Sequence, residues 1–126
     1  MRGGQTFEVD EAKDFVRVVG HGMWTPADAR AHFRALDEAL RAFRSENRRV
    51  VFLLDMRNAV VQSRETAMAM HTGAMRMQRS TDIVAVVTSS ILHAMQIKSV
   101  SKVSALATFH EMDEAMIWLA AQRCHA

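Results

Sequence analysis

The chain has 126 residues, of which 49% are hydrophobic, 24% charged and 6% aromatic. This length and balance are those of one ordinary globular domain, large enough to bury a core without disulfides or a structural metal. Sixteen Lys and Arg against fourteen Asp and Glu leave a formal net charge of +2, which gives no reason to expect a nucleic-acid-binding protein. The single cysteine, Cys124, has no partner for an internal disulfide and no zinc-ligand spacing around it. We therefore expect residues 1–126 to form a single domain, with a core between about residues 6 and 121.

The sequence shows no sign of a membrane span or a secretion signal. Its longest apolar runs, Val50–Leu54 and Ile83–Val87, are far shorter than the roughly 20 residues that cross a bilayer as a helix. The first five residues are polar and lack the apolar segment of a signal peptide. The sequence therefore predicts a cytoplasmic protein.

The first third of the chain predicts a β-hairpin followed by a helix. Polar and apolar residues alternate over Thr6–Asp10, and a β-branched apolar run follows over Phe15–Val19. The first strand is the more polar of the two, so we expect it at the edge of the sheet. A helix is predicted from Pro26 to about Arg44, because Thr25 is placed to cap it and apolar residues recur at helical spacing. These apolar residues are Phe33, Leu36, Leu40 and Phe43.

The middle of the chain predicts a strand, a helix and a second strand. Val50–Leu54 and Ile83–Val87 are continuous apolar runs, which are typical of strands covered on both faces. Between them, Arg64–Arg79 has helical spacing, and Ser63 is available as its cap. A unit of this kind requires a crossover connection and a parallel pair of strands.

The last third predicts a helix, a short strand and a final helix. Ser89 and Ser90 can cap a helix that runs to about Val103, with Ile91, Leu92 and Met95 facing the core. A fifth strand is predicted at Ala105–Phe109. The final helix is predicted to bury Met112, Ala115, Met116 and Leu119. The whole chain is then an α/β protein in the order ββαβαβαβα, with four helices and a mixed, mainly parallel five-stranded sheet whose strand order the sequence leaves open.

This order resembles the STAS superfamily and, more narrowly, its SpoIIAA-like or STAS/SEC14-type bacterial proteins. The resemblance also rests on Val-Phe-Leu-Leu-Asp-Met-Arg at residues 51–57 and Glu-Ala-Met-Ile-Trp-Leu at 114–119, and it extends from Phe7 to Leu119. It implies the STAS fold in one small, often dimeric domain, for which binding of an apolar small molecule has been considered. In the anti-sigma-factor antagonists of the superfamily, a serine two residues after the Asp that ends the central strand is phosphorylated to break a complex with a kinase. Arg57 stands at that position here, so the resemblance brings no phosphoserine switch to this chain.

Polar and aromatic side chains are predicted to gather at one rim of the sheet, where ligands of open α/β folds bind. They follow the second, third and fourth strands: His21, Met23, Trp24, Asp55, Arg57, Asn58, Ser89 and Ser90. In one interpretation, Asp55 orients Arg57, which holds an anion or a partner together with a helix N-terminus. In the other, Asp55 caps a loop, Arg57 is solvated and the two serines cap a helix, which are ordinary roles for such residues.

Methionine is the unusual part of the composition, with ten in the chain. Four of them lie on the helix predicted at 64–79: Met68, Met70, Met75 and Met77. Met70 and Met77 share one stripe and are predicted to fill the core, whereas Met68 and Met75 form a second stripe that cannot face the same sheet. This second stripe is a candidate pocket wall, mobile lid or dimer contact, with core filling as an equal alternative. Trp118, beside the buried face of the last helix, is a candidate core edge or partner anchor.

No catalytic or metal-binding motif is visible in the sequence. The histidines are scattered, and there is neither a G-x-S-x-G motif nor a phosphate-binding glycine loop. The sequence therefore predicts a non-catalytic STAS-like regulatory or protein-interaction module, without cofactor or metal, working as a homodimer or with a regulatory protein. The alternative is a carrier or sensor of an apolar, lipid-like small molecule near the Met-rich helix. An enzyme built around Asp55 and His21 is a third hypothesis.

Overall fold

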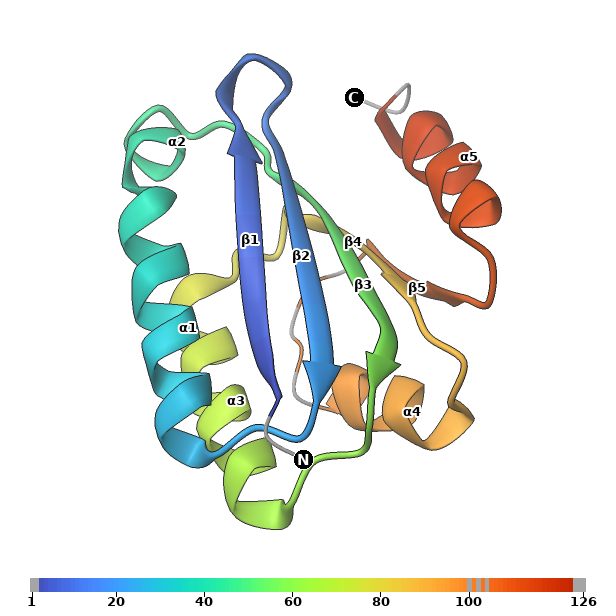
Figure 1. Ribbon diagram of the computed structural model, residues 1–126. Coiled ribbons are helices and arrows are strands. Elements are labelled where there is room, and N and C mark those ends of the chain that lie inside the picture. Colours follow the sequence, from blue (N-terminus) through green and yellow to red (C-terminus); the bar gives the residue numbers. More distant parts are fainter. Residues whose placement is uncertain (1–2, 100, 102, 104, 124–126) are drawn as a thin grey trace.

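A five-stranded sheet in the order β1-β2-β3-β4-β5 forms the centre of the computed structural model, which describes residues 3–99, 101, 103 and 105–123 (Figure 1). The strands are β1 (Gly4–Asp10), β2 (Phe15–Gly22), β3 (Val51–Ala59), β4 (Ile83–Val87) and β5 (Ala105–Phe109). β1 and β2 are antiparallel, whereas β2 to β5 run parallel to one another. The more polar β1 lies at one edge, as the sequence predicted, and Cys124 lies outside the described residues.

The helices follow the predicted order, with one division. They are α1 (Pro26–Ala39), α2 (Arg41–Ser45), α3 (Arg64–Met77), α4 (Ile91–Ser99) and α5 (Met112–Arg123), and a single 3₁₀ turn joins β1 to β2. The helix predicted from Pro26 to Arg44 is divided at Leu40, whose ψ of −1° departs from helical geometry and turns α2 toward the sheet. Thr25 caps α1 as predicted, since its side chain accepts a hydrogen bond from the backbone N–H of Asp28.

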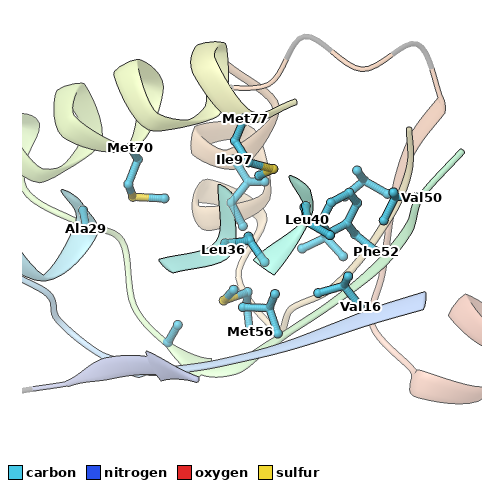
Figure 2. Close-up of a cluster of buried hydrophobic side chains, with 14 of the residues drawn as sticks. Val16, Ala29, Leu36, Leu40, Val50, Phe52, Met56, Met70, Met77 and Ile97 are labelled. Atoms are coloured by element: carbon cyan, nitrogen blue, oxygen red, sulfur yellow. The ribbon is translucent and has the colours of Figure 1, made fainter. Parts of the chain in front are cut away.

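One face of the sheet is covered by α1 and α3, which lie side by side (Figure 1). Their apolar side chains meet those of the sheet in a closely packed layer, in which Met70 and Met77 of α3 are buried as predicted. Figure 2 shows these two methionines on the same side as Leu36 of α1, with Met56 of β3 below them. This layer is the larger of the two cores.

α5 covers only part of the opposite face. Ala115 and Leu119 are buried against β3, β4 and β5, with Trp118 at the edge of this smaller core. Met116 was predicted to be buried with them, but it turns toward the β1–β2 hairpin and is half exposed. α5 packs mainly on β3 to β5 and also reaches the start of β2, where the Arg123 guanidinium lies over the Phe15 ring.

The buried side of α4 differs from the prediction. Ile91, Leu92 and Met95 were expected to face the core, but they are 71%, 68% and 61% exposed, and His93 and Ile97 are buried instead. α4 is apolar on nearly every side, so the spacing of its apolar residues does not indicate which side packs. The helix also ends at Ser99, short of the predicted Val103.

Gly73, in the middle of α3, lets α1 approach closely. A Cβ atom at Gly73 would lie 2.5 Å from Cγ of Phe33 on α1, and real side chains do not pack at that distance. Phe33 therefore occupies the space that a side chain at Gly73 would take. The spacing of the two helices depends on the absence of that side chain.

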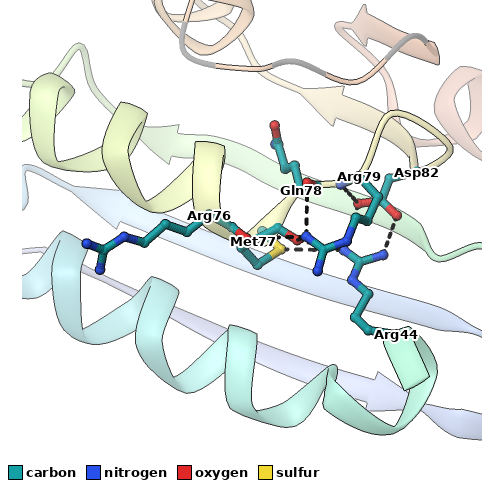
Figure 3. Close-up of polar contacts among 6 residues, drawn as sticks. All are labelled: Arg44, Arg76, Met77, Gln78, Arg79 and Asp82. Carbon is teal, nitrogen blue, oxygen red and sulfur yellow. Dashed lines mark hydrogen bonds and ion pairs between the residues drawn. The ribbon is translucent and has the colours of Figure 1, made fainter. Parts of the chain in front are cut away.

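A buried ion pair lies where α2 meets the end of α3 (Figure 3). The Arg44 guanidinium on α2 donates to Oδ1 and Oδ2 of Asp82 at 2.6 and 2.8 Å, and also to the backbone carbonyl of Met77 at 2.9 Å. Asp82 is fully buried and also accepts from the backbone N–H of Arg79 at 2.9 Å. Arg44 thus links α2 to the end of α3 and the start of β4.

The Gly73→Ala substitution tests the contact with Phe33. Alanine raises helix propensity by about 1 kcal/mol, but the clash with the Phe33 ring costs about 1–3 kcal/mol, so we expect lower stability. Urea denaturation measures this as a lower midpoint with an unchanged slope. Thr72→Ala, at the neighbouring exposed position, is the control and should not lower the midpoint. A stabilised Gly73→Ala protein would show that the two helices do not need this close approach.

Candidate functional site

Four of the predicted rim residues lie within strands rather than beyond them. The sequence predicted β2 to end near Val19 and β3 near Leu54, but the two strands continue to pair through His21 with Asn58 and Gly22 with Ala59. This pairing resumes after a register irregularity between Val19 and His21. The prediction that these residues follow their strands is therefore wrong. Asp55 and Arg57 instead project from β3 on the face that α5 covers only in part.

Asp55 and Arg57 form a two-point ion pair on that face. Nε and one terminal nitrogen of Arg57 donate to the two carboxylate oxygens of Asp55 at 2.8 and 2.7 Å, and Arg17 of β2 lies 3.9 Å away. The Asp55 side chain is 10% exposed and that of Arg57 is 47% exposed. The hydrogen bonds from Arg57 hold the pKa of the Asp55 carboxyl below its usual value. Asp55 therefore stays ionised at neutral pH and already occupies one edge of the Arg57 guanidinium.

The two predicted serines do different things. The Ser90 hydroxyl accepts a hydrogen bond from the backbone N–H of His93 at 3.1 Å, which is the bond of a helix cap. The Ser89 hydroxyl donates to the backbone carbonyl of Arg57 at 3.5 Å. These contacts bring the start of α4 next to β3, but they leave the serine hydroxyls engaged with backbone atoms.

Met23 and Trp24 point in opposite directions. Met23 is about half exposed, whereas Trp24 is buried and its indole N–H donates to the backbone carbonyls of His21 at 3.0 Å and Gly4 at 3.1 Å. The backbone N–H of Trp24 also donates to the side chain of Gln62 at 2.7 Å. Trp24 thus joins the ends of β1, β2 and β3 from inside.

An apolar cavity of about 50 Å³ lies between the sheet and the two helices α1 and α3. Its lining includes Trp24, Leu36, Met56, Met70, Met77 and Ile97. The cavity volume is larger than the ~30 Å³ that one molecule occupies in liquid water, and most of the cavity lining is apolar. The methionines that line it are Met70 and Met77 of the predicted core stripe. Met68 of the second stripe is exposed in a separate groove between α1 and α3, Met75 is half-buried, and Trp118 packs on Phe109 with ring centres 5.8 Å apart.

Two histidines that pack against aromatic rings were not singled out by the sequence. His93 is fully buried, its ring nitrogens have no hydrogen-bond partner among the described residues, and its ring meets Trp24 edge-on at 6.4 Å. His32 lies between the rings of Phe7 and Phe33, at 5.9 and 5.2 Å. Burial lowers the pKa of His93 and lowers that of His32 to about 4, so both are neutral at pH 7. Only the packing of α4 and α1 identifies them, since neither belongs to a sequence motif.

Six large apolar side chains on the segments that follow β2, β3 and β4 are exposed. We call this set the rim surface, and it consists of Met23, Val60, Val61, Ile91, Leu92 and Met95. Figure 1 places the end of β3 and α4 at the same end of the molecule. Met23 was among the predicted rim residues, but the α4 part was missed because those residues were expected to be buried.

Comparisons with known proteins identify the fold. An uncharacterised protein of the DUF3478 family with a SpoIIAA-like fold, from Shewanella loihica PV-4, matches with a TM-score of 0.72 at 17% identity, over 93% of this chain and 94% of that one. An anti-sigma factor antagonist from Mycobacterium paratuberculosis matches with a TM-score of 0.57 at 11% identity, over 93% of this chain and 95% of that one. Neither a family model nor a curated protein matches the sequence. The predicted STAS-type, SpoIIAA-like fold is thus confirmed.

The described residues contain neither a membrane-spanning helix nor a metal-binding cluster. None of their helices has the length and apolar character needed to cross a membrane. In the same part of the chain, no three His, Cys, Asp or Glu side chains come together as a metal-binding group would.

Replacing Arg57 with glutamine should raise the pKa of Asp55, because its two strongest hydrogen bonds are lost. A lowered native pKa stabilises the fold above the unfolded pKa of 3.8, and this contribution is lost as the pH falls through the native value. An NMR titration of the Asp55 carboxyl carbon measures the change. Arg17→Gln is the control and should shift the pKa less, since Arg17 lies 3.9 Å away. An unchanged Asp55 pKa in Arg57→Gln would contradict the pairing.

Proposed function

We propose that this chain is a non-catalytic regulatory or protein-interaction module that forms a homodimer through the rim surface. The observation that carries the proposal is the exposure of Ile91, Leu92 and Met95, each more than 60% exposed on one short helix. A soluble monomer gains nothing by leaving large apolar side chains in water, and contiguous patches of this kind mark interaction sites. Met23, Val60 and Val61, on the segments that directly follow β2 and β3, are exposed as well.

The rim surface is held in place by hydrogen bonds between its parts. The backbone N–H of Gln62 donates to the side chain of Gln96 at 2.9 Å, and the Gln96 amide donates back to the carbonyl of Gln62 at 3.1 Å. The backbone N–H of Val60 donates to the carbonyl of Gly22 at 3.3 Å. A surface that is already formed loses little conformational entropy on association.

A second copy of the chain suits this surface because its six side chains carry no charge. In an isologous dimer, the same patch of each subunit forms the two sides of the interface. An uncharged apolar patch can therefore pack against its copy without like-charge repulsion. A charged patch would need a partner of opposite sign. We therefore propose that the partner is a second copy of the chain. Binding to a different regulatory protein is the alternative that the experiment must distinguish.

The non-catalytic part of the proposal is supported by the state of Asp55 and Arg57. Asp55 is ionised, is paired at two points and has a lowered pKa, which is the opposite of a carboxyl tuned for proton transfer near neutral pH. The resemblance drawn from the sequence places Arg57 at the position of the phosphorylated serine of the anti-sigma-factor antagonists. An interaction controlled in another way than by that serine is consistent with the fold of the anti-sigma factor antagonist found by comparison.

Ile91→Asp should abolish or weaken the dimer. A carboxylate at the interface centre would have to be desolvated, and the same residue in the first turn of α4 is favourable for the helix. Sedimentation velocity over a range of protein concentrations reports the change. Ile117→Asp is the matched control, because Ile117 is also 71% exposed but lies on α5, outside the rim surface. A wild-type protein that stays monomeric at all concentrations would contradict the homodimer and leave a different protein as the partner.

A second candidate function is supported by the apolar cavity. Its walls include Met56, Met70 and Met77, flexible side chains that adapt to a bound molecule. The cavity therefore favours a carrier or sensor of a small apolar molecule, which was the alternative drawn from the sequence. The cavity lies on the side of α3 that faces the sheet.

Xenon tests the cavity, because the cavity volume of about 50 Å³ is much smaller than the ~150 Å³ of a cavity known to take up benzene. We expect xenon to shift the methyl resonances of Met56 and Met70, which line the cavity, in an NMR titration with selectively labelled methionine. Met116, half exposed near the hairpin, is the internal control and should not shift. Equal shifts at Met116 and Met70 would indicate unspecific contact, and no shift at Met70 would exclude this candidate.

A further inference from the structure

A groove of about 330 Å³ runs along the outer surface between α1 and α3. Phe33 of α1 and Met68, Ala69 and Met77 of α3 give it an apolar lining. The contact between Phe33 and Gly73 holds the two helices together beneath it. The volume lies at the lower end of the ~300–1,000 Å³ range of small-molecule sites.

Three arginines line this groove: Arg30 and Arg34 of α1 and Arg76 of α3. Within the described part of the chain, their guanidinium groups make no hydrogen bond or ion pair, whereas those of Arg44, Arg48 and Arg57 are all paired. Figure 3 shows the Arg76 side chain extending along the space between α3 and α1, away from the Arg44–Asp82 pair. The groove thus combines an apolar lining with unpaired positive charge.

Two carboxylates, Asp37 and Glu65, also line the groove and reduce its positive charge without cancelling it. Three arginines against two acids leave an excess of one positive charge. A ligand that carries one negative charge would neutralise the set, whereas a cation would add to the excess. Replacing either acid with its neutral amide should therefore strengthen the binding of an anion.

We infer that the groove binds a small anion with a single apolar chain, such as a medium-chain carboxylate or the corresponding alkyl phosphate. The anionic group pairs with the arginines, whose planar guanidinium groups donate two parallel hydrogen bonds to carboxylate or phosphate oxygens. The chain lies along Phe33 and Met68, which is the part of the second methionine stripe that the core does not use. This inference extends the second candidate function from an apolar to an amphipathic ligand and places it in a different space, so the two can fail separately.

The test uses four probes with the same ten-carbon chain, each below its micelle-forming concentration. Decanoate and decyl phosphate should shift the Met68 methyl resonance at saturable concentrations, and the tighter of the two identifies the preferred anion. Decanol should bind at least about tenfold more weakly, and decyltrimethylammonium should not bind, because the arginines act only on a negative group. Added salt should weaken the binding of both anions.

Paired substitutions then test the direction of the charge effect. Arg34→Gln should weaken decanoate binding about fivefold to tenfold, and Asp37→Asn should strengthen it. Arg41→Gln, at an exposed position outside the groove, is the matched control and should leave the affinity unchanged. All three positions are away from the buried core, and an unchanged urea midpoint shows that each variant is folded.

Several results would overturn the inference. Absence of decanoate binding would do so directly. Equal binding of decanol, or an affinity that ignores Arg34 and Asp37, would show that only apolar contact is involved. Decanoate that shifts Met70 but not Met68 would place the ligand in the inner cavity, which supports the second candidate function and removes the groove. Xenon binding without decanoate binding would likewise support the cavity and reject the groove.

Discussion

The close contact between Phe33 and Gly73 determines how the helical layer is built. Because Gly73 has no side chain, the Phe33 ring lies against the backbone of α3 and brings α1 to the distance that the core requires. The inner cavity lies on the sheet side of this contact and the arginine-lined groove lies on its outer side, and Phe33 lines both. A single small residue therefore controls the size of two separate spaces, and any change there alters both together.

Much of the fold can be predicted from the sequence because the strongest signals are local. β3 and β4 are apolar runs covered on both faces, and the capping pattern at Thr25 and Pro26 marks the start of α1. By contrast, the side of α4 that packs against the rest of the protein cannot be inferred from the residues of the helix alone. The helix crosses the ends of the strands. His93 rather than Leu92 faces inward, and its ring packs against Trp24. A helix that is apolar on nearly every side offers no periodicity from which this can be inferred.

The candidate site shows the same limit. Asp55 and Arg57 are two apart on one strand, so their placement on one face follows from strand geometry, and one of the two interpretations drawn from the sequence paired them. Their position within the strand depends on how far β2 and β3 pair beyond Gly20, which involves residues far apart in the chain. Arg44 and Asp82 are 38 positions apart, and no sequence spacing links them. The arginines of the groove come from two helices that only their tertiary packing brings together.

The half-buried His32 and the fully buried His93 make folding a proton-releasing process in mildly acidic solution. An unfolded chain takes up a proton at each histidine near pH 6.5, but burial holds the native His32 pKa at about 4 and lowers that of His93 as well. Between these values the unfolded chain binds more protons than the native one, so stability declines as the pH falls below about 6.5. His93 anchors α4, which carries half of the rim surface, and His32 of α1 lines the apolar cavity. Acid therefore acts first on the elements that carry the proposed contacts, while the ion-paired face of β3 is unaffected until Asp55 itself is protonated.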